Sequence, residues 1–148
     1  MHGVKGQGSI FGTTAWGLGF ALPRADAAVS TLLEDLSQRG LLESTLVVLV
    51  GEFGRTPLVT TNRDGIPGRD HHSSCYAALL AGAGIRGGTV YGASDKIGAH
   101  VKDKPVSPED FAATLYHALG VPPETGLSRP DGFTQHISAG QPILDLFG

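Results

Sequence analysis

One short apolar segment, residues 45–50, constrains the fold of this chain more than any other feature. It is a run of threonine, valine and leucine without polar residues in alternation, which is typical of a strand buried on both faces of a parallel sheet. The run ends at Gly51, and Glu52 and Arg55 follow it. Because α/β proteins place ligands at the carboxyl ends of parallel strands, we expect an α/β fold with a polar site beyond this strand.

Two helices and a second strand complete the predicted layers. Apolar residues at helical spacing predict a helix over 23–39, which Gly40 would end. Residues 75–81 predict a second strand, and residues 89–91 a short strand that could lie at an edge. A helix is predicted over 107–119, with Ser107 as its cap. The predicted inward residues are Ala25, Ala28, Val29, Leu32, Leu33 and Leu36 on the first helix, and Phe111, Leu115, Ala118 and Leu119 on the second.

The remaining segments are predicted to be irregular. Residues 1–22 carry six glycines, which lose much entropy on ordering, so we expect an irregular N-terminal segment before one α/β unit over 23–148. Residues 57–74 are predicted to be loop, because Gly65, Pro67 and Gly68 interrupt any regular pattern. The single Cys75 allows no intrachain disulfide and is expected to be a small buried apolar residue.

Charge and hydropathy exclude several classes of partner. A net charge of -3 gives no reason to expect nucleic acid or an anionic membrane surface. No apolar run approaches the roughly 20 residues that a membrane-spanning helix needs. The first residues lack the apolar region of a signal peptide, so nothing in this segment directs export.

Two polar clusters, at residues 52–55 and 69–72, contain the residues that could do chemistry. Asp70, His71 and His72 are consecutive, and Glu52 could add a carboxylate. Such nitrogen and oxygen groups bind zinc and related metals. Adjacent residues seldom all reach one ion, so one of the two histidines would instead support the site. Arg55 and Arg69 have the planar fork that grips phosphate or sulfate in a bidentate way.

A structural role is the alternative for both clusters. Glu52 would then pair with Arg55 or Arg69, and the two histidines would bond to backbone groups. The residues alone leave both readings open, with the structural one the more common for such patterns. The other histidines are expected to have ordinary surface roles; they are His2, His100, His117 and His136.

Several ordered motifs resemble a known family. The chain from about residue 23 to 148 resembles the bacterial family called domain of unknown function 1501. The motifs that carry the resemblance are LLESTLVV at 41–48, EFGRTP at 52–57, GRDH at 68–71, LLAGAGIRGG at 79–88, VYGASD at 90–95 and DFAATLYHALG at 110–120. The resemblance implies a sulfatase-like branch of the alkaline phosphatase superfamily, with an α/β/α sandwich around a mostly parallel sheet.

The resemblance also implies roles for particular residues. Superfamily members end the strand matching residues 45–50 with a metal-binding Asp-His pair, where this chain has Gly51, Glu52 and Phe53. Glu52 is the only ligand-type residue there. His71 best matches a further superfamily histidine, and Asp70 and His72 flank it. A divalent metal such as zinc or calcium is therefore implied, with a small-molecule sulfate or phosphate ester as substrate.

Two departures qualify this implied activity. The superfamily nucleophile lies near the start of the full-length fold, in a part that this chain does not contain. Relatives also carry a Trp-Asp-Thr-His-like segment where this chain has Ala-Trp-Gly-Leu-Gly at 15–19. We therefore expect a C-terminal fragment, or a truncated or internally deleted product, of a longer parent. The parent would be periplasmic or secreted if it resembles exported relatives.

Three hypotheses follow: a metal-dependent hydrolase domain, a non-catalytic relative that binds a ligand or partner, or a remnant without independent function. An incomplete sheet would expose an edge strand, so self-association is also expected.

Overall fold

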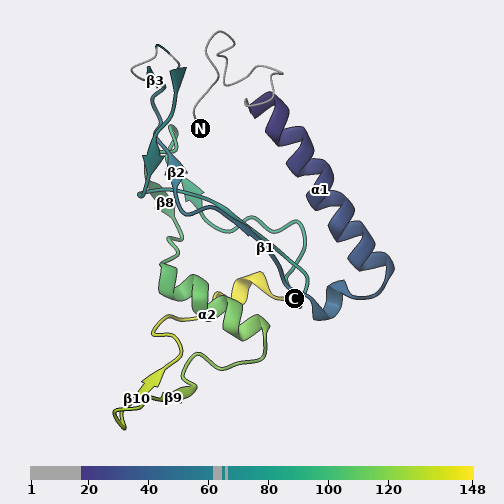
Figure 1. Ribbon diagram of the computed structural model, residues 1–148, viewed down its shortest axis with the longest axis vertical. Coiled ribbons are helices and arrows are strands. Elements are labelled where there is room, and N and C mark those ends of the chain that lie inside the picture. Colours follow the sequence, from purple (N-terminus) through teal and green to yellow (C-terminus); the bar gives the residue numbers. More distant parts are fainter. Residues whose placement is uncertain (1–17, 62–64, 66) are drawn as a thin grey trace.

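The computed structural model describes residues 18–61, 65 and 67–148 (Figure 1). These residues form two α-helices, two short 3-10 helices and ten short strands, which join in five pairs. Their bounds are α1 Leu18–Gln38, η1 Leu42–Ser44, β1 Val47–Val50, β2 Gly54–Arg55, β3 Thr60–Thr61, β4 Pro67–Gly68, β5 His71–His72, β6 Ala78–Ala81, β7 Ala93–Ser94, β8 Val101–Asp103, α2 Pro108–Ala118, β9 Gly126–Ser128, β10 Thr134–His136 and η2 Leu144–Leu146.

Helix α1 is longer than its apolar pattern predicts. It starts at Leu18 and contains Pro23, which was expected to open it. The Arg24 guanidinium donates to the Phe20 carbonyl at 3.0 Å and lies 3.6 Å from the centre of the Phe20 ring, which ties the added turn to the rest of the helix. The prediction that residues 1–22 are irregular is therefore wrong for 18–22, and residues 1–17 lie outside the described part.

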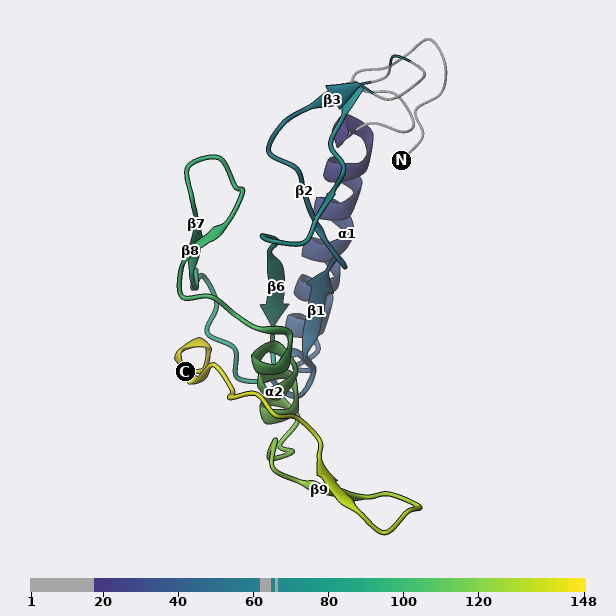
Figure 2. The ribbon, with the colours of Figure 1, turned by 90° about the vertical axis from the view of Figure 1, so that its left-hand side faces the viewer.

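The two predicted strands form an antiparallel pair. β1 and β6 pair in the register Val47↔Ala81 to Val50↔Ala78, and Figure 2 shows the two strands side by side with their arrows in opposite directions. Every sheet within the described residues has two antiparallel strands, so the fold is a mixed α/β arrangement and the expected mostly parallel α/β/α sandwich is wrong. The physical reason lies in the connection: parallel neighbours need a crossover, usually a helix, whereas the chain between β1 and β6 forms short hairpin ladders instead.

Two smaller predictions are also wrong. The segment predicted to be loop over 57–74 contains β3, β4 and β5. The short strand predicted over 89–91 is absent from those residues, and β7 follows it, pairing with β8 through an irregular register. Gly92, at φ +76°, separates the two positions, because a backbone in this left-handed region does not continue a strand.

Helix α2 begins as the sequence predicts. Ser107 accepts a hydrogen bond from the Asp110 N–H at 3.0 Å, and Pro108 occupies the first turn. The Asp110 carboxylate accepts from the Gln141 N–H at 2.8 Å. The pKa of Asp110 is lowered chiefly by that bond and then by the Ser107 hydroxyl. These contacts fix the C-terminal segment to the start of the helix.

The buried centre of the molecule lies on α2. Ala113 and Thr114 are fully buried, and the Thr114 hydroxyl donates to Asp110 O at 2.7 Å while accepting from the Ile143 N–H at 3.0 Å. Leu119, predicted to face inward, is 65% exposed and is a correction. It lies at the end of the helix, where the chain turns away at Gly120.

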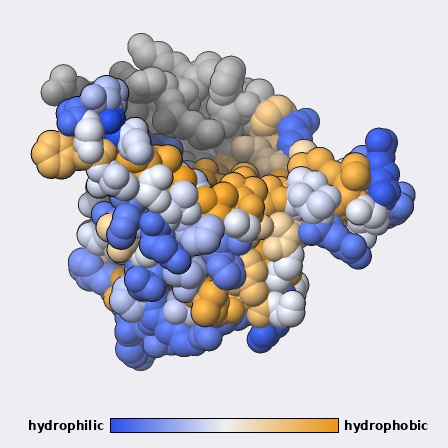
Figure 3. All heavy atoms as spheres, turned by 90° about the horizontal axis from the view of Figure 1, so that it is seen from below, coloured by the Kyte–Doolittle hydropathy of each residue, from blue (hydrophilic) through white to orange (hydrophobic). Residues whose placement is uncertain are grey.

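The strand predicted to be buried on both faces is partly open to solvent, and so is the strand that pairs with it. Leu49 and Val50 of β1 are 50% and 45% exposed, and Leu79 of β6 is 41% exposed. Among the elements, α1 packs mainly on η1, its neighbour in sequence (Figure 1), so it does not cover the strand pair as a layer. Figure 3 shows apolar side chains reaching the surface across one face of the molecule. No helix of the described residues is long and apolar enough to cross a membrane.

Candidate functional site

The two polar clusters predicted from the sequence meet at one pair of strands. β2 pairs with β5, with Gly54 opposite His72 and Arg55 opposite His71. A Cβ at position 54 would overlap the Cys75 carbonyl oxygen, so only glycine lets β2 approach this closely. Because directly opposed residues of an antiparallel pair share a face, the Arg55 and His71 side chains lie on the same side of the ladder.

Glu52 and His71 form the first interaction of the site. The His71 Nδ1 lies 3.5 Å from Glu52 Oε1, and the two side chains are 55% and 71% exposed. The Phe53 ring meets the imidazole edge-on, with the ring centres 5.2 Å apart. The predicted alternative in which Glu52 pairs with an arginine has no such contact in the described structure, where Glu52 lies beside the His71 imidazole.

Asp70 is directed elsewhere. Its N–H donates to the Thr56 hydroxyl at 3.0 Å, and its carboxylate accepts from the Thr60 hydroxyl at 3.4 Å. The Thr56 N–H donates to the Asp70 carbonyl at 2.9 Å. Since successive residues of an extended segment point to opposite faces, Asp70 lies away from the face that carries His71.

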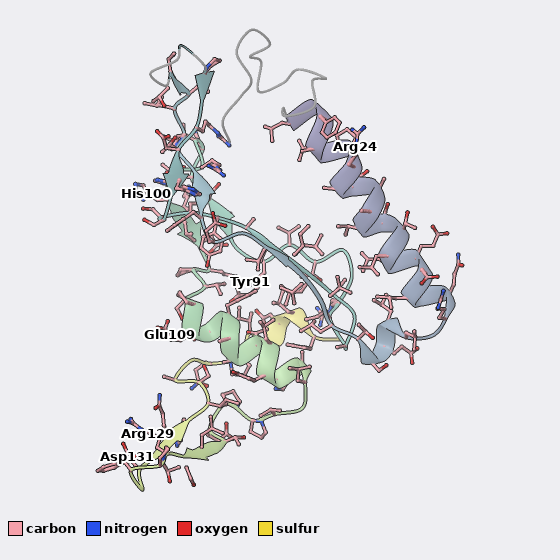
Figure 4. All side chains as sticks on the ribbon, viewed as in Figure 1. Arg24, Tyr91, His100, Glu109, Arg129 and Asp131 are labelled. Carbon is pink, nitrogen blue, oxygen red and sulfur yellow. The ribbon has the colours of Figure 1, made fainter. Side chains whose placement is uncertain are left out.

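His72 also leaves the face that carries His71. Its Nε2 lies 2.6 Å from the Ala99 carbonyl oxygen, so this nitrogen donates and carries the proton. The His100 ring lies 6.2 Å away, centre to centre, and Figure 4 shows His100 beside the region of β2 and β8. A backbone bond was one of the predicted structural roles for the two histidines, and this contact confirms it for His72.

The loop that presents Ala99 and His100 is held by one carboxylate. Asp95 accepts from the backbone N–H groups of Ile97, Ala99 and His100 at 3.1, 2.8 and 3.2 Å. The Asp95 N–H in turn donates to the His100 carbonyl at 2.9 Å. His100 was expected to have an ordinary surface role. The position of His100 could have been inferred from Asp95, which is followed by Gly98 before the next strand. This pattern is typical of a turn in which an aspartate side chain accepts hydrogen bonds from the backbone.

The side chain of Arg55 contacts the backbone of Arg69. The Arg55 guanidinium lies 3.5 Å from the Arg69 carbonyl oxygen, at the limit of a hydrogen bond. Both residues are exposed. The geometry thus gives Arg55 and His71 a common face that faces solvent, with Glu52 bordering it.

The four predicted metal ligands do not come together. Among the residues the structure describes, no group of three or more histidine, cysteine, aspartate or glutamate side chains is placed to hold a metal ion. Glu52 and His71 are close to each other, whereas Asp70 and His72 have partners of their own. The residues present therefore supply two ligands of the three or four that zinc takes from a protein.

Comparison with known proteins places the chain in a class defined by sequence. Residues 15–147 match the model of a family described as protein of unknown function (DUF1501). The chain belongs to the DUF1501 family, which confirms the family resemblance. No curated protein and no solved structure matches the chain.

Proposed function

We propose that this chain is a ligand-binding member of the DUF1501 family, and that the face shared by Arg55 and His71 receives the oxyanion of a sulfate or phosphate ester. The observation that carries the proposal is the β2–β5 register, which sets Arg55 directly opposite His71. A guanidinium fork and an imidazole N–H are both donors suited to tetrahedral anions.

The surroundings of this face set the strength of binding. Glu52 lies beside His71 and offsets part of the positive charge. The face is open to water, where each ionic contact contributes about 1 kcal/mol or less. We therefore expect a weak site, with dissociation constants on the order of millimolar. Arg69, whose carbonyl contacts Arg55, is the nearest candidate for a second fork.

A metal-dependent hydrolase is the second candidate function. The observation that favours it is the Glu52–His71 pair, which brings a carboxylate and an imidazole within 3.5 Å. A divalent ion held there would polarise an ester oxygen. Two ligands do not complete such a site, so we assign no catalytic step to this chain and rank hydrolysis below binding.

Titration with sulfate, inorganic phosphate and their 4-nitrophenyl esters tests the binding proposal by NMR. We expect saturable shifts of the Arg55 and His71 amide signals. Arg55→Gln should weaken binding by about three- to fivefold, because it removes one exposed ionic contact. Arg129→Gln is the matched control, since Arg129 pairs with Asp131 in the β9–β10 hairpin at 2.9 Å, far from the site (Figure 4).

The same samples separate the two candidate functions. Absence of saturable shifts in the parent chain, or equal affinity in Arg55→Gln, would contradict oxyanion binding. Zinc or calcium added alone, with metal content measured before and after His71→Ala, tests the hydrolase candidate. A metal bound in stoichiometric amount and lost in His71→Ala, together with release of 4-nitrophenol, would favour hydrolysis.

A further inference from the structure

The β1–β6 pair has two open edges. Within the described residues, β1 and β6 pair only with each other, and their sheet contains no third strand. The outward N–H and C=O groups of β1 are thus available to another strand. Native edges are usually blocked by a charge, a proline or a bulge, and residues 47–50 are valine, valine, leucine and valine.

Helix α1 adds a second unpartnered apolar surface. Along its stripe, Leu22 is 59% and Leu32 is 46% exposed, and Val29, Leu33 and Leu36 are partly exposed. A helix of this kind gains most of its stability by burying its apolar face against other elements. Figure 1 shows α1 extending along one side of the molecule, with its first turns far from α2.

The total surface area leaves room for a large interface. The chain exposes 10589 Å², whereas a folded monomer of 15.3 kDa exposes about 7,100 Å² by the usual size scaling. A standard protein interface removes about 800 Å² from each partner. About a quarter of the excess would therefore supply an interface of this size.

We propose that a second copy of this chain covers these surfaces. The β1 strands of the two copies pair antiparallel about a two-fold axis and form a continuous sheet in the order β6-β1-β1-β6, on which the α1 stripes pack. A two-fold axis makes the contact self-complementary and closed. Residues 47–50 carry no charge, so two identical strands pair without repulsion. Valine at three of four positions also favours β1 over the alanine-flanked β6 as the pairing edge.

Size-exclusion chromatography with light scattering tests this dimer. We expect a mass twice that of the 15.3 kDa chain, which dissociates on dilution. Leu49→Lys places a charge on the pairing edge and should raise the dissociation constant about tenfold or more. Leu58→Lys is the matched control, because Leu58 is 76% exposed and lies outside α1, β1 and β6. A monomer at every concentration, or a polydisperse aggregate, would overturn the proposal.

A crosslink keeps the proposal testable if Leu49→Lys does not fold. Leu49→Cys in a Cys75→Ser background places one thiol near the middle of β1. Mild oxidation should give a covalent dimer in good yield, whereas Leu58→Cys in the same background should remain monomeric. A dimer by light scattering with equal crosslinking of both variants would show that the edge of β1 is not the interface.

Discussion

At the scale of single residues, Asp95 has the best-defined electrostatic role. Its pKa lies below the ordinary value first because the Ala99 N–H donates to it, with burial opposing and the Ile97 and His100 N–H groups adding to the decrease. A carboxyl whose pKa is lowered on folding stabilises the folded state above its unfolded pKa, near 4, and loses that contribution as the pH falls through the lowered value.

We therefore expect the 95–100 loop to stay closed at pH 5 and to open in acid below about pH 4. Asp95→Asn should loosen the loop at neutral pH and remove this acid dependence, because an amide has only one acceptor oxygen for the three N–H groups. Hydrogen exchange of the Ala99 and His100 amides measures the effect. Asp131→Asn, in the β9–β10 hairpin, is the control, and unchanged exchange in Asp95→Asn would contradict the prediction.

The candidate site could be predicted in part at this scale. The sequence suggests that the 52–55 and 69–72 clusters belong to one site, and the β2–β5 pair brings the two clusters together. The opposite orientation of the His71 and His72 side chains could not be predicted. It depends on the alternation of side chains along a two-residue strand, and the glycines and proline of this segment indicate a loop. The partner of His72 comes from residue 99, and a contact this distant leaves no local pattern.

At the scale of elements, Gly82 joins the end of β6 to the turn before β1. Its φ of +80° is unfavourable for other residues, and a Cβ there would overlap the Thr45 and Leu42 carbonyl oxygens. Gly82→Ala should destabilise the β1–β6 pair by about 1–3 kcal/mol.

Gly88→Ala is the control for this change. Gly88 has a similar φ of +72° but nothing within 4 Å of an added Cβ, so it carries the conformational cost without the overlap. Hydrogen exchange of the β1 and β6 amides gives the difference in the free energy of opening this pair. Equal losses in the two variants would show that the approach of residue 82 to Leu42 and Thr45 does not stabilise the pair.

The elements themselves follow the local sequence closely where their signals are local. The cap of α2 and the apolar runs of β1 and β6 are found within a few residues of their predicted positions. The arrangement of these elements in space could not be predicted from the same local signals. An apolar run without alternation indicates burial on both faces, but it contains no information about strand direction or about which layer does the covering.

At the scale of the whole molecule, cooperativity should be low. Ala113 and Thr114 are the fully buried side chains of the described part, and both belong to α2. The strand pairs are small and separate, so few contacts make their unfolding depend on one another. We expect the dilute, monomeric chain to unfold over a broad temperature range.

Calorimetry and circular dichroism together measure this property. The unfolding enthalpy should fall well below the roughly 0.7 kcal/mol per residue of ordinary globular proteins, and the two methods should give different midpoints. A single sharp transition, with coincident midpoints at low concentration, would contradict the prediction.

The exposed β1–β6 pair should affect how much of the protein accumulates in a cell. Unpaired edges and open apolar strands resemble the features of incompletely folded chains, on which chaperones and proteases act. If two copies pair through β1 as proposed, the association of a newly made copy competes with its degradation. Its abundance should rise more steeply than its rate of synthesis, since encounters between copies increase with the square of their concentration.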